Sequence, residues 1–123
     1  CSGASAALCC TDAPFEGPVA TVRVGRLVTE RGEQFVLNPT HAQMEYSDLD
    51  LVLSGHVDGV NMIEVGAAEI TEADLIEALK FGYNEGILPI IDLIEELEDI
   101  LKQGLEEHTP LEETVEMMLD LLA

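Results

Sequence analysis

Two aspartates, Asp48 and Asp50, are the most suggestive chemical groups in the sequence. They alternate with apolar residues in a segment that is typical of a β-strand, so both side chains are expected on one face, about 6.5 Å apart along the backbone. Two carboxylates at that spacing could hold one divalent cation. A solvent-facing strand edge accounts for the same pattern without a metal, and we favour that interpretation.

Other candidate groups are weaker. The three histidines, His41, His56 and His108, lie far apart, and none has a histidine three or four residues away. They would form a metal cluster or a catalytic dyad only if folding brought them together. Residues 2–5 (SGAS) at a helix start could bind an anion through backbone amides, but no GxxxxGK pattern supports this.

The sequence has three cysteines, Cys1, Cys9 and Cys10. They indicate neither a disulfide framework nor a zinc site, because their number is odd, two are adjacent, and no CxxC spacing occurs. Free thiols fit a reducing cytoplasm, and an organelle matrix fits equally. No stretch approaches the roughly 20 apolar residues that span a bilayer. The chain opens with Cys1 in a run of small residues, from which we expect a piece of a longer protein.

The charge of the chain is strongly acidic, with 25 carboxylates against five cations and a net charge of −20. Residues 71–123 hold 15 of those carboxylates and only two of the cations. Such a surface repels phosphate backbones, so the chain is not expected to be a principal RNA-binding face. A solvated acidic helical surface is the simplest explanation, and docking to a basic partner is the alternative.

The hydrophobic pattern of the sequence predicts an α+β fold, with an antiparallel sheet followed by a helical part. The segment 49–66, with a hairpin turn at Asp58-Gly59, is expected to form the centre of that sheet. Leu49, Leu51 and Leu53 would share its buried face. The strands are expected at 20–29, 34–38, 48–54 and 60–66, and two short helices at 4–10 and 40–46.

The helical part begins at Thr71, which with Asp74 resembles a capping box. Gly86 and Pro89 are expected to bend or break this helix. A second apolar stripe should end at Gly104. The run 109–112 (TPLE) predicts another helix start, followed by an apolar face that is exposed unless other helices cover it.

Five strings carry a resemblance to a known family: GASAAL (3–8), PFEGPVATVRVGRL (14–27), FVLNPT (35–40), SDLDLVLSG (47–55) and AAEITEADLIEALKFGY (67–83). In this order and spacing they resemble the polynucleotide phosphorylases, especially their first RNase PH-like core. The resemblance implies the ribosomal protein S5 domain 2-like superfamily fold. It places the C-terminal half of that core at 1–86 and the start of an all-helical linker at 87–123.

The resemblance also implies a function for the longer protein. The family degrades RNA from the 3′ end by attack of inorganic phosphate, releases nucleoside diphosphates, and requires Mg²⁺. Its chains carry two such cores and assemble as homotrimers around an RNA channel. The implied partners of this segment are therefore the remainder of the polypeptide and the other subunits, with RNA bound elsewhere and no membrane involved.

A comparison with the family's active second core implies that this segment is non-catalytic. That core has the pattern LGDxDHLGDMD, with two catalytic acids six residues apart. Asp48 matches the later acid, whereas the earlier one falls at Ala42 or Gln43, where no carboxylate exists. The resemblance therefore implies no catalytic, RNA-binding or metal-binding residue here. Two alternatives stay open: an active single-core RNase PH relative, and an acidic interaction module that uses the helices of 87–122.

Overall fold

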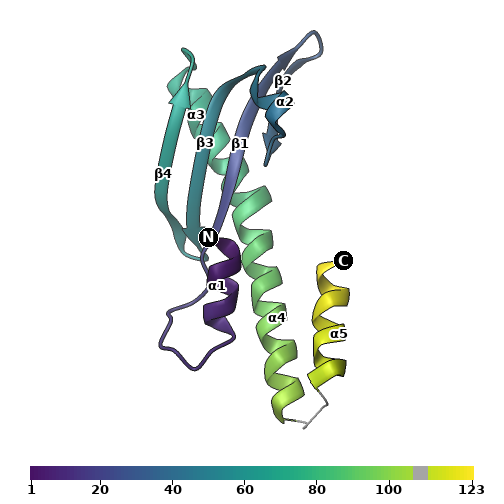
Figure 1. The fold of residues 1–123 in the computed structure, drawn as a ribbon. Coiled ribbons are helices and arrows are strands. Elements are labelled where there is room, and N and C mark those ends of the chain that lie inside the picture. Colours follow the sequence, from purple (N-terminus) through teal and green to yellow (C-terminus); the bar gives the residue numbers. More distant parts are fainter. Residues whose placement is uncertain (107–110) are drawn as a thin grey trace.

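The chain is an α+β domain in which helices cover one face of a four-stranded antiparallel sheet, and this confirms the predicted fold class (Figure 1). The structure is a computed structural model that describes residues 1–106 and 111–123. Its elements in chain order are α1 (Ser2–Cys9), β1 (Ala20–Thr29), β2 (Gly32–Leu37), α2 (His41–Met44), β3 (Ser47–His56), β4 (Gly59–Ala67), α3 (Glu72–Phe81), the π-helix η1 (Gly82–Ile87), α4 (Leu88–Glu106) and α5 (Leu111–Leu122).

The sheet has the strand order β2-β1-β3-β4, so β1 and β3 are central and the other two strands form its edges. Two hairpins use glycine where the backbone adopts a positive φ, at Gly32 (116°) and Gly59 (155°). The predicted turn at Asp58-Gly59 is thereby confirmed, since His56 pairs with Gly59 across it. The predicted position of β1 is also confirmed.

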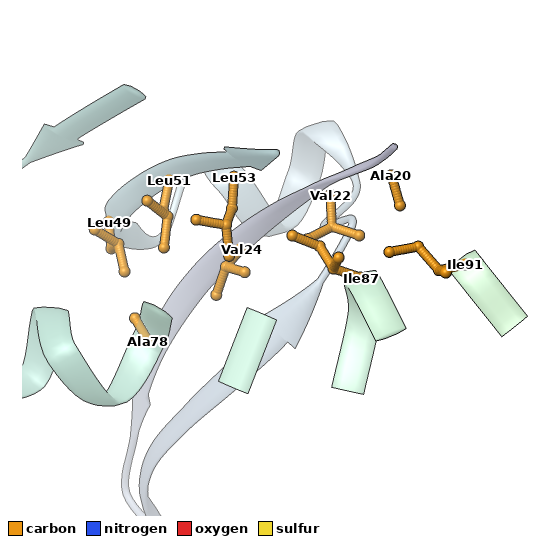
Figure 2. Close-up of a cluster of buried hydrophobic side chains, with 9 residues drawn as sticks. All are labelled: Ala20, Val22, Val24, Leu49, Leu51, Leu53, Ala78, Ile87 and Ile91. Atoms are coloured by element: carbon orange, nitrogen blue, oxygen red, sulfur yellow. The ribbon is translucent and has the colours of Figure 1, made fainter. Parts of the chain in front are cut away.

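The core lies between the two central strands and the helical layer (Figure 2). Leu49, Leu51 and Leu53 are at most 1% exposed, as their alternation predicts. The expectation that all of 49–66 is central was wrong, because β4 is an edge strand and its Ile63 is 49% exposed. The other core residues are Ala20, Val22, Val24, Ala78, Ile87 and Ile91.

One continuous helical segment runs from α3 through η1 into α4, so the chain does not break at Gly86 and Pro89, where a bend or a break was expected. The helix widens into a π-helix at Gly82–Ile87. Pro89 comes directly after this turn, where the backbone hydrogen-bond pattern changes from π-helical to α-helical. Added Cβ atoms at Gly82 and Gly86 would lie 2.9 Å from methyl groups of β1, so glycine allows this close approach. The predicted domain boundary after residue 86 falls within this segment and stays a prediction.

The helix α4 also continues past Gly104, which was expected to end it. Gly104 is buried and packs against Thr114 of α5, so this glycine serves helix packing and not helix termination. The predicted helix start at 109–112 lies partly outside the described residues, and α5 is described from Leu111 onward.

Replacing Gly104 with alanine is expected to separate α5 from α4. The new Cβ would lie 2.4 Å from Thr114 Oγ1 and 2.9 Å from its Cγ2, too close for either helix to keep its position. Hydrogen exchange of the α5 amides should accelerate, while the sheet amides stay protected. Gly3→Ala is the matched control, because its Cβ meets nothing within 4 Å. Unchanged exchange in α5 would contradict the close packing.

Candidate functional site

A β-bulge in β3 determines where the two candidate aspartates point. Gly25 pairs with Asp50 and Leu27 pairs with Ser47, so β3 carries one residue more than β1 between these pairs. The Ser47 hydroxyl accepts from the backbone N–H of Arg26 at 3.0 Å and of Leu49 at 3.3 Å, and it donates to the Leu49 carbonyl at 2.6 Å. This serine therefore stabilises the bulge.

The bulge separates Asp48 from Asp50. Asp48 turns to the helix-covered face, where it lies 3.7 Å from Nη2 of Arg26. Asp50 points to the opposite face and accepts two bonds from Arg23, at 2.6 Å from Nε and 2.5 Å from Nη2. The expectation that both carboxylates share one face was wrong, because simple alternation fails across an extra residue.

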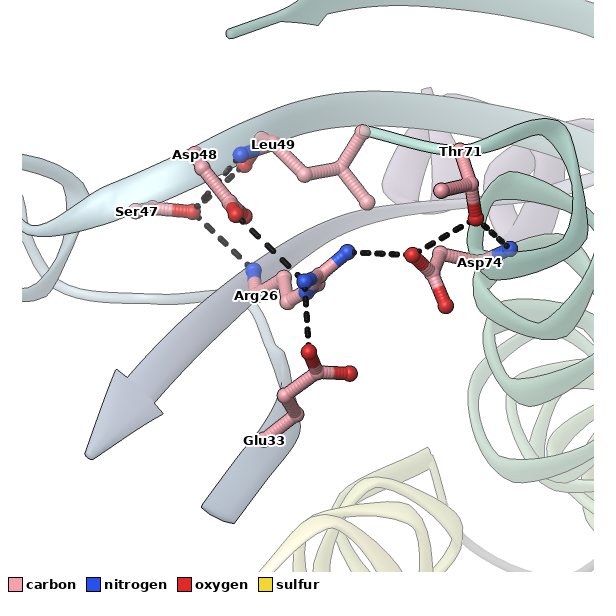
Figure 3. Close-up of polar contacts among 7 residues, drawn as sticks. All are labelled: Arg26, Glu33, Ser47, Asp48, Leu49, Thr71 and Asp74. Atoms are coloured by element: carbon pink, nitrogen blue, oxygen red, sulfur yellow. Dashed lines mark hydrogen bonds and ion pairs between the residues drawn. The ribbon is translucent and has the colours of Figure 1, made fainter. Parts of the chain in front are cut away.

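Arg26 gathers three carboxylates from three different elements (Figure 3). Its Nη1 donates to Oδ2 of Asp74 in α3, and its Nη2 donates to Oε1 of Glu33 in β2, both at 2.8 Å. Asp48 of β3 is the third. The arginine side chain is only 9% exposed, so this guanidinium joins the edge strand, the bulge and the start of α3 at one buried point.

The start of α3 supplies Asp74 to this cluster. The Thr71 hydroxyl accepts from the Asp74 backbone N–H at 3.2 Å and donates to its Oδ2 at 2.7 Å. The predicted cap at Thr71 is confirmed, although the carboxylate is directed to Arg26 and to the Thr71 hydroxyl. The hydrogen bond from Thr71, followed by the charge of Arg26, lowers the pKa of Asp74.

The free energy of unfolding of the domain is expected to decrease when the pH is lowered below about 4. The pKa values of Asp50 and Asp74 are lowered in the folded state, by the Arg23 hydrogen bond and by the Thr71 hydrogen bond respectively. Their stabilisation is therefore present above the unfolded-state pKa and lost as the pH falls through the folded-state pKa.

Urea unfolding at several pH values measures this loss. Asp50→Asn should flatten the acidic limb of the curve, and Arg23→Met should flatten it equally. The double variant should add nothing further, because both changes remove the same pair. An acidic limb that keeps its slope in both single variants would exclude this pair as a source.

The geometry does not fit the Mg²⁺ that the family resemblance implies for the longer protein. A guanidinium already lies among the three carboxylates, and the described residues contain no group of three or more metal-ligating side chains placed to hold an ion. Ala42 and Gln43, which match the earlier acid, lie on α2 and offer no carboxylate. Asp48 Oδ1 and Arg26 Nε are buried without hydrogen-bond partners.

The remaining candidates have local structural contacts. The Nδ1 atom of His56 accepts from the Asp58 backbone N–H at 3.2 Å within the hairpin turn. The SGAS segment uses its hydroxyls internally: Ser2 accepts from the Thr21 N–H at 3.0 Å and Ser5 from the Val19 N–H at 2.7 Å. His41 begins α2, His108 lies outside the described residues, and all three cysteines are free thiols.

Sequence reasoning missed the role of Arg26, although one signal was available. Arg26 has the same two-residue period as the buried Val22 and Val24. A charged residue at a core position indicates a paired buried charge. The acidic partners could not be assigned, because they come from segments 7, 22 and 48 residues away.

A four-stranded antiparallel sheet with a one-sided helical layer is consistent with the C-terminal domain of RNase PH-like proteins. Residues 17–85 match the family model described as "3' exoribonuclease family, domain 2". The chain belongs to this 3′ exoribonuclease family.

Curated relatives agree with this assignment. The chain is 42% identical over 97% of its length to a polyribonucleotide nucleotidyltransferase of Prochlorococcus marinus (strain NATL1A), and it covers 16% of that protein. It is 44% identical over 89% of its length to the enzyme of that name from Staphylococcus saprophyticus, covering 15% of it. It is 47% identical over 83% of its length to the polyribonucleotide nucleotidyltransferase of Thermosynechococcus vestitus, covering 13% of that protein. These matches confirm the resemblance to polynucleotide phosphorylase, and the chain spans about a sixth of such proteins or less.

No helix in the described parts of the chain is both long enough and apolar enough to cross a membrane.

Proposed function

We propose that this chain is a non-catalytic structural core of a phosphate-dependent 3′-to-5′ exoribonuclease that acts in mRNA degradation. The observation that carries the proposal is the engagement of Asp48 by Arg26. This aspartate matches one acid of the family's metal-binding pair, yet an arginine and not a second carboxylate is its neighbour. Without a metal clamp, the charge that develops on a transferring phosphoryl group would lack its main stabilisation.

Assembly is the role that remains for this segment. The chain would connect the remainder of the first core to a helical linker and contribute to a homotrimer, with RNA, Mg²⁺ and inorganic phosphate bound by other parts of the protein. Its net charge of −20 supports this division, since RNA would be repelled from its surface. A cytoplasmic location, or an organelle matrix, fits three free thiols.

An active single-core relative is the less favoured alternative. Such an enzyme needs two acids that converge on one ion, whereas Ala42 or Gln43 stands at the position of the earlier acid. The nearby Asp50 does not replace it, because Asp48 and Asp50 contact different arginines on opposite faces of the sheet.

Asp48→Asn in the longer protein is expected to leave phosphorolysis within about twofold of the wild-type rate, because one acid without its partner supplies no metal clamp. The measurement is the release of nucleoside diphosphates from RNA in the presence of phosphate and Mg²⁺. The 123-residue chain alone should release none. A hundredfold loss in a folded Asp48→Asn variant, or turnover by the isolated chain, would refute the non-catalytic assignment.

A further inference from the structure

Three carboxylates surround Arg26 in an arrangement that suits a planar cation and not a spherical one. Asp74 Oδ2 accepts from Nη1 and Glu33 Oε1 accepts from Nη2, both at 2.8 Å, so these two oxygens contact different nitrogen atoms (Figure 3). Asp48 Oδ2 lies 3.7 Å from Nη2. A metal ion would need all three oxygens within about 2.0–2.6 Å of one point. The carboxylates are instead spaced around a guanidinium, whose N–H donors point outward in one plane.

The attachment of Arg26 to β1 leaves this arrangement incompletely used. Arg26 Nε and Asp48 Oδ1 are both buried, and neither has a hydrogen-bond partner in the described parts of the chain. Nε–H is a donor and the carboxylate oxygen is an acceptor, yet the backbone of Arg26 is fixed, because its N–H donates to the Ser47 hydroxyl at 3.0 Å. A guanidinium without this attachment could move toward Asp48 while it kept its bonds to Glu33 and Asp74.

Truncation of Arg26 would open a space with a path to solvent. The arginine side chain is 9% exposed, so the position that its guanidinium occupies is enclosed by the domain itself. Glu33, on the edge strand β2, is 55% exposed and forms the open side. Replacement of Arg26 by alanine keeps Cβ and removes the atoms that make up N-ethylguanidinium. Three carboxylates left without a counter-charge would attract a cation of that shape.

We propose that Glu33, Asp48 and Asp74 form a guanidinium-binding site, which Arg26 fills from within the chain and which takes a free alkylguanidinium cation when that side chain is truncated. The planar positive group, and not its covalent link to β1, is what joins β2, the bulge of β3 and the start of α3. This inference is independent of the enzymatic role proposed above, because it concerns only contacts within the chain.

The test is urea unfolding of the Arg26→Ala chain at constant ionic strength with N-ethylguanidinium, ethylammonium or Mn²⁺. At about 50 mM, N-ethylguanidinium should raise the ratio of folded to unfolded protein at least about fivefold, because a ligand that binds only the folded state stabilises it by mass action. Ethylammonium carries the charge without the planar fork, and Mn²⁺ is spherical, so each should raise the ratio less than about twofold. The wild-type chain, whose site is already filled, should respond to none of them.

Two further variants locate the response. Arg23→Ala is the matched control, because its pair with Asp50 is exposed and no carboxylate trio surrounds it, so N-ethylguanidinium should not stabilise it. The double variant Arg26→Ala/Glu33→Gln should lose most of the response. If Arg26→Ala is unfolded without ligand, recovery of its circular dichroism spectrum on addition of N-ethylguanidinium replaces the urea measurement. An equal effect of ethylammonium or Mn²⁺, an undiminished response in the double variant, or no response to N-ethylguanidinium by either measurement would each overturn the proposal.

Discussion

Leu51→Asp is expected to destabilise the domain by about 4 kcal/mol or more, a large part of the stability of a small domain. Leu51 is fully buried on the helix-covered face of the central strand β3, which lies between β1 and β4 in the sheet. A carboxylate there would lose its hydration without gaining a partner, in addition to the loss of the leucine contacts. Urea unfolding followed by circular dichroism measures the change.

Ile63→Asp is the matched control for this substitution. Ile63 lies beside Leu53 in the sheet, but on the edge strand β4, where it is 49% exposed. Its aspartate would stay hydrated, so the loss of stability should be at most about 1 kcal/mol. If the two variants lost equal stability, β4 would have to be covered in solution, which would exclude its position as a free edge.

Arg26→Met is expected to cost about 2–3 kcal/mol, because methionine fills the space of the arginine stem but leaves three carboxylates without their counter-charge. The guanidinium is the common partner of Glu33, Asp48 and Asp74. These carboxylates are partly hydrated, with side chains 26% to 55% exposed, so the loss is smaller than for a fully buried pair. Arg26→Lys should recover only part of it, since a lysine cannot reproduce the planar fork.

Arg23→Met separates the effect of burial from that of charge. Its pair with Asp50 is bidentate but exposed, with side chains 45% and 39% accessible. Removing it should change stability much less than removing Arg26. Equal losses of unfolding free energy in the two arginine variants, measured by urea unfolding at neutral pH, would show that the buried cluster stabilises the domain no more than the exposed pair does.

Local chemistry determined much of this fold from the sequence alone. The strand at 20–29, the turn at Asp58-Gly59, the cap at Thr71 and the buried Leu49, Leu51 and Leu53 were all predicted correctly. Each depends on near neighbours in the chain: a two-residue alternation, a glycine that tolerates positive φ, or a hydroxyl that accepts from a backbone amide. The family resemblance likewise required only the order of short strings.

Tertiary structure decided the features that depend on contacts between distant segments. Gly86 was expected to bend or break a helix and Gly104 to end one, but these glycines permit close packing against β1 and against Thr114 respectively. The bulge that separates Asp48 from Asp50 exists only in the pairing of β3 with β1. Arg26 acquires its role because three carboxylates distant in sequence converge on it. The sequence thus determined local propensity and periodicity, whereas the candidate site arose from register and packing, which no local pattern encodes.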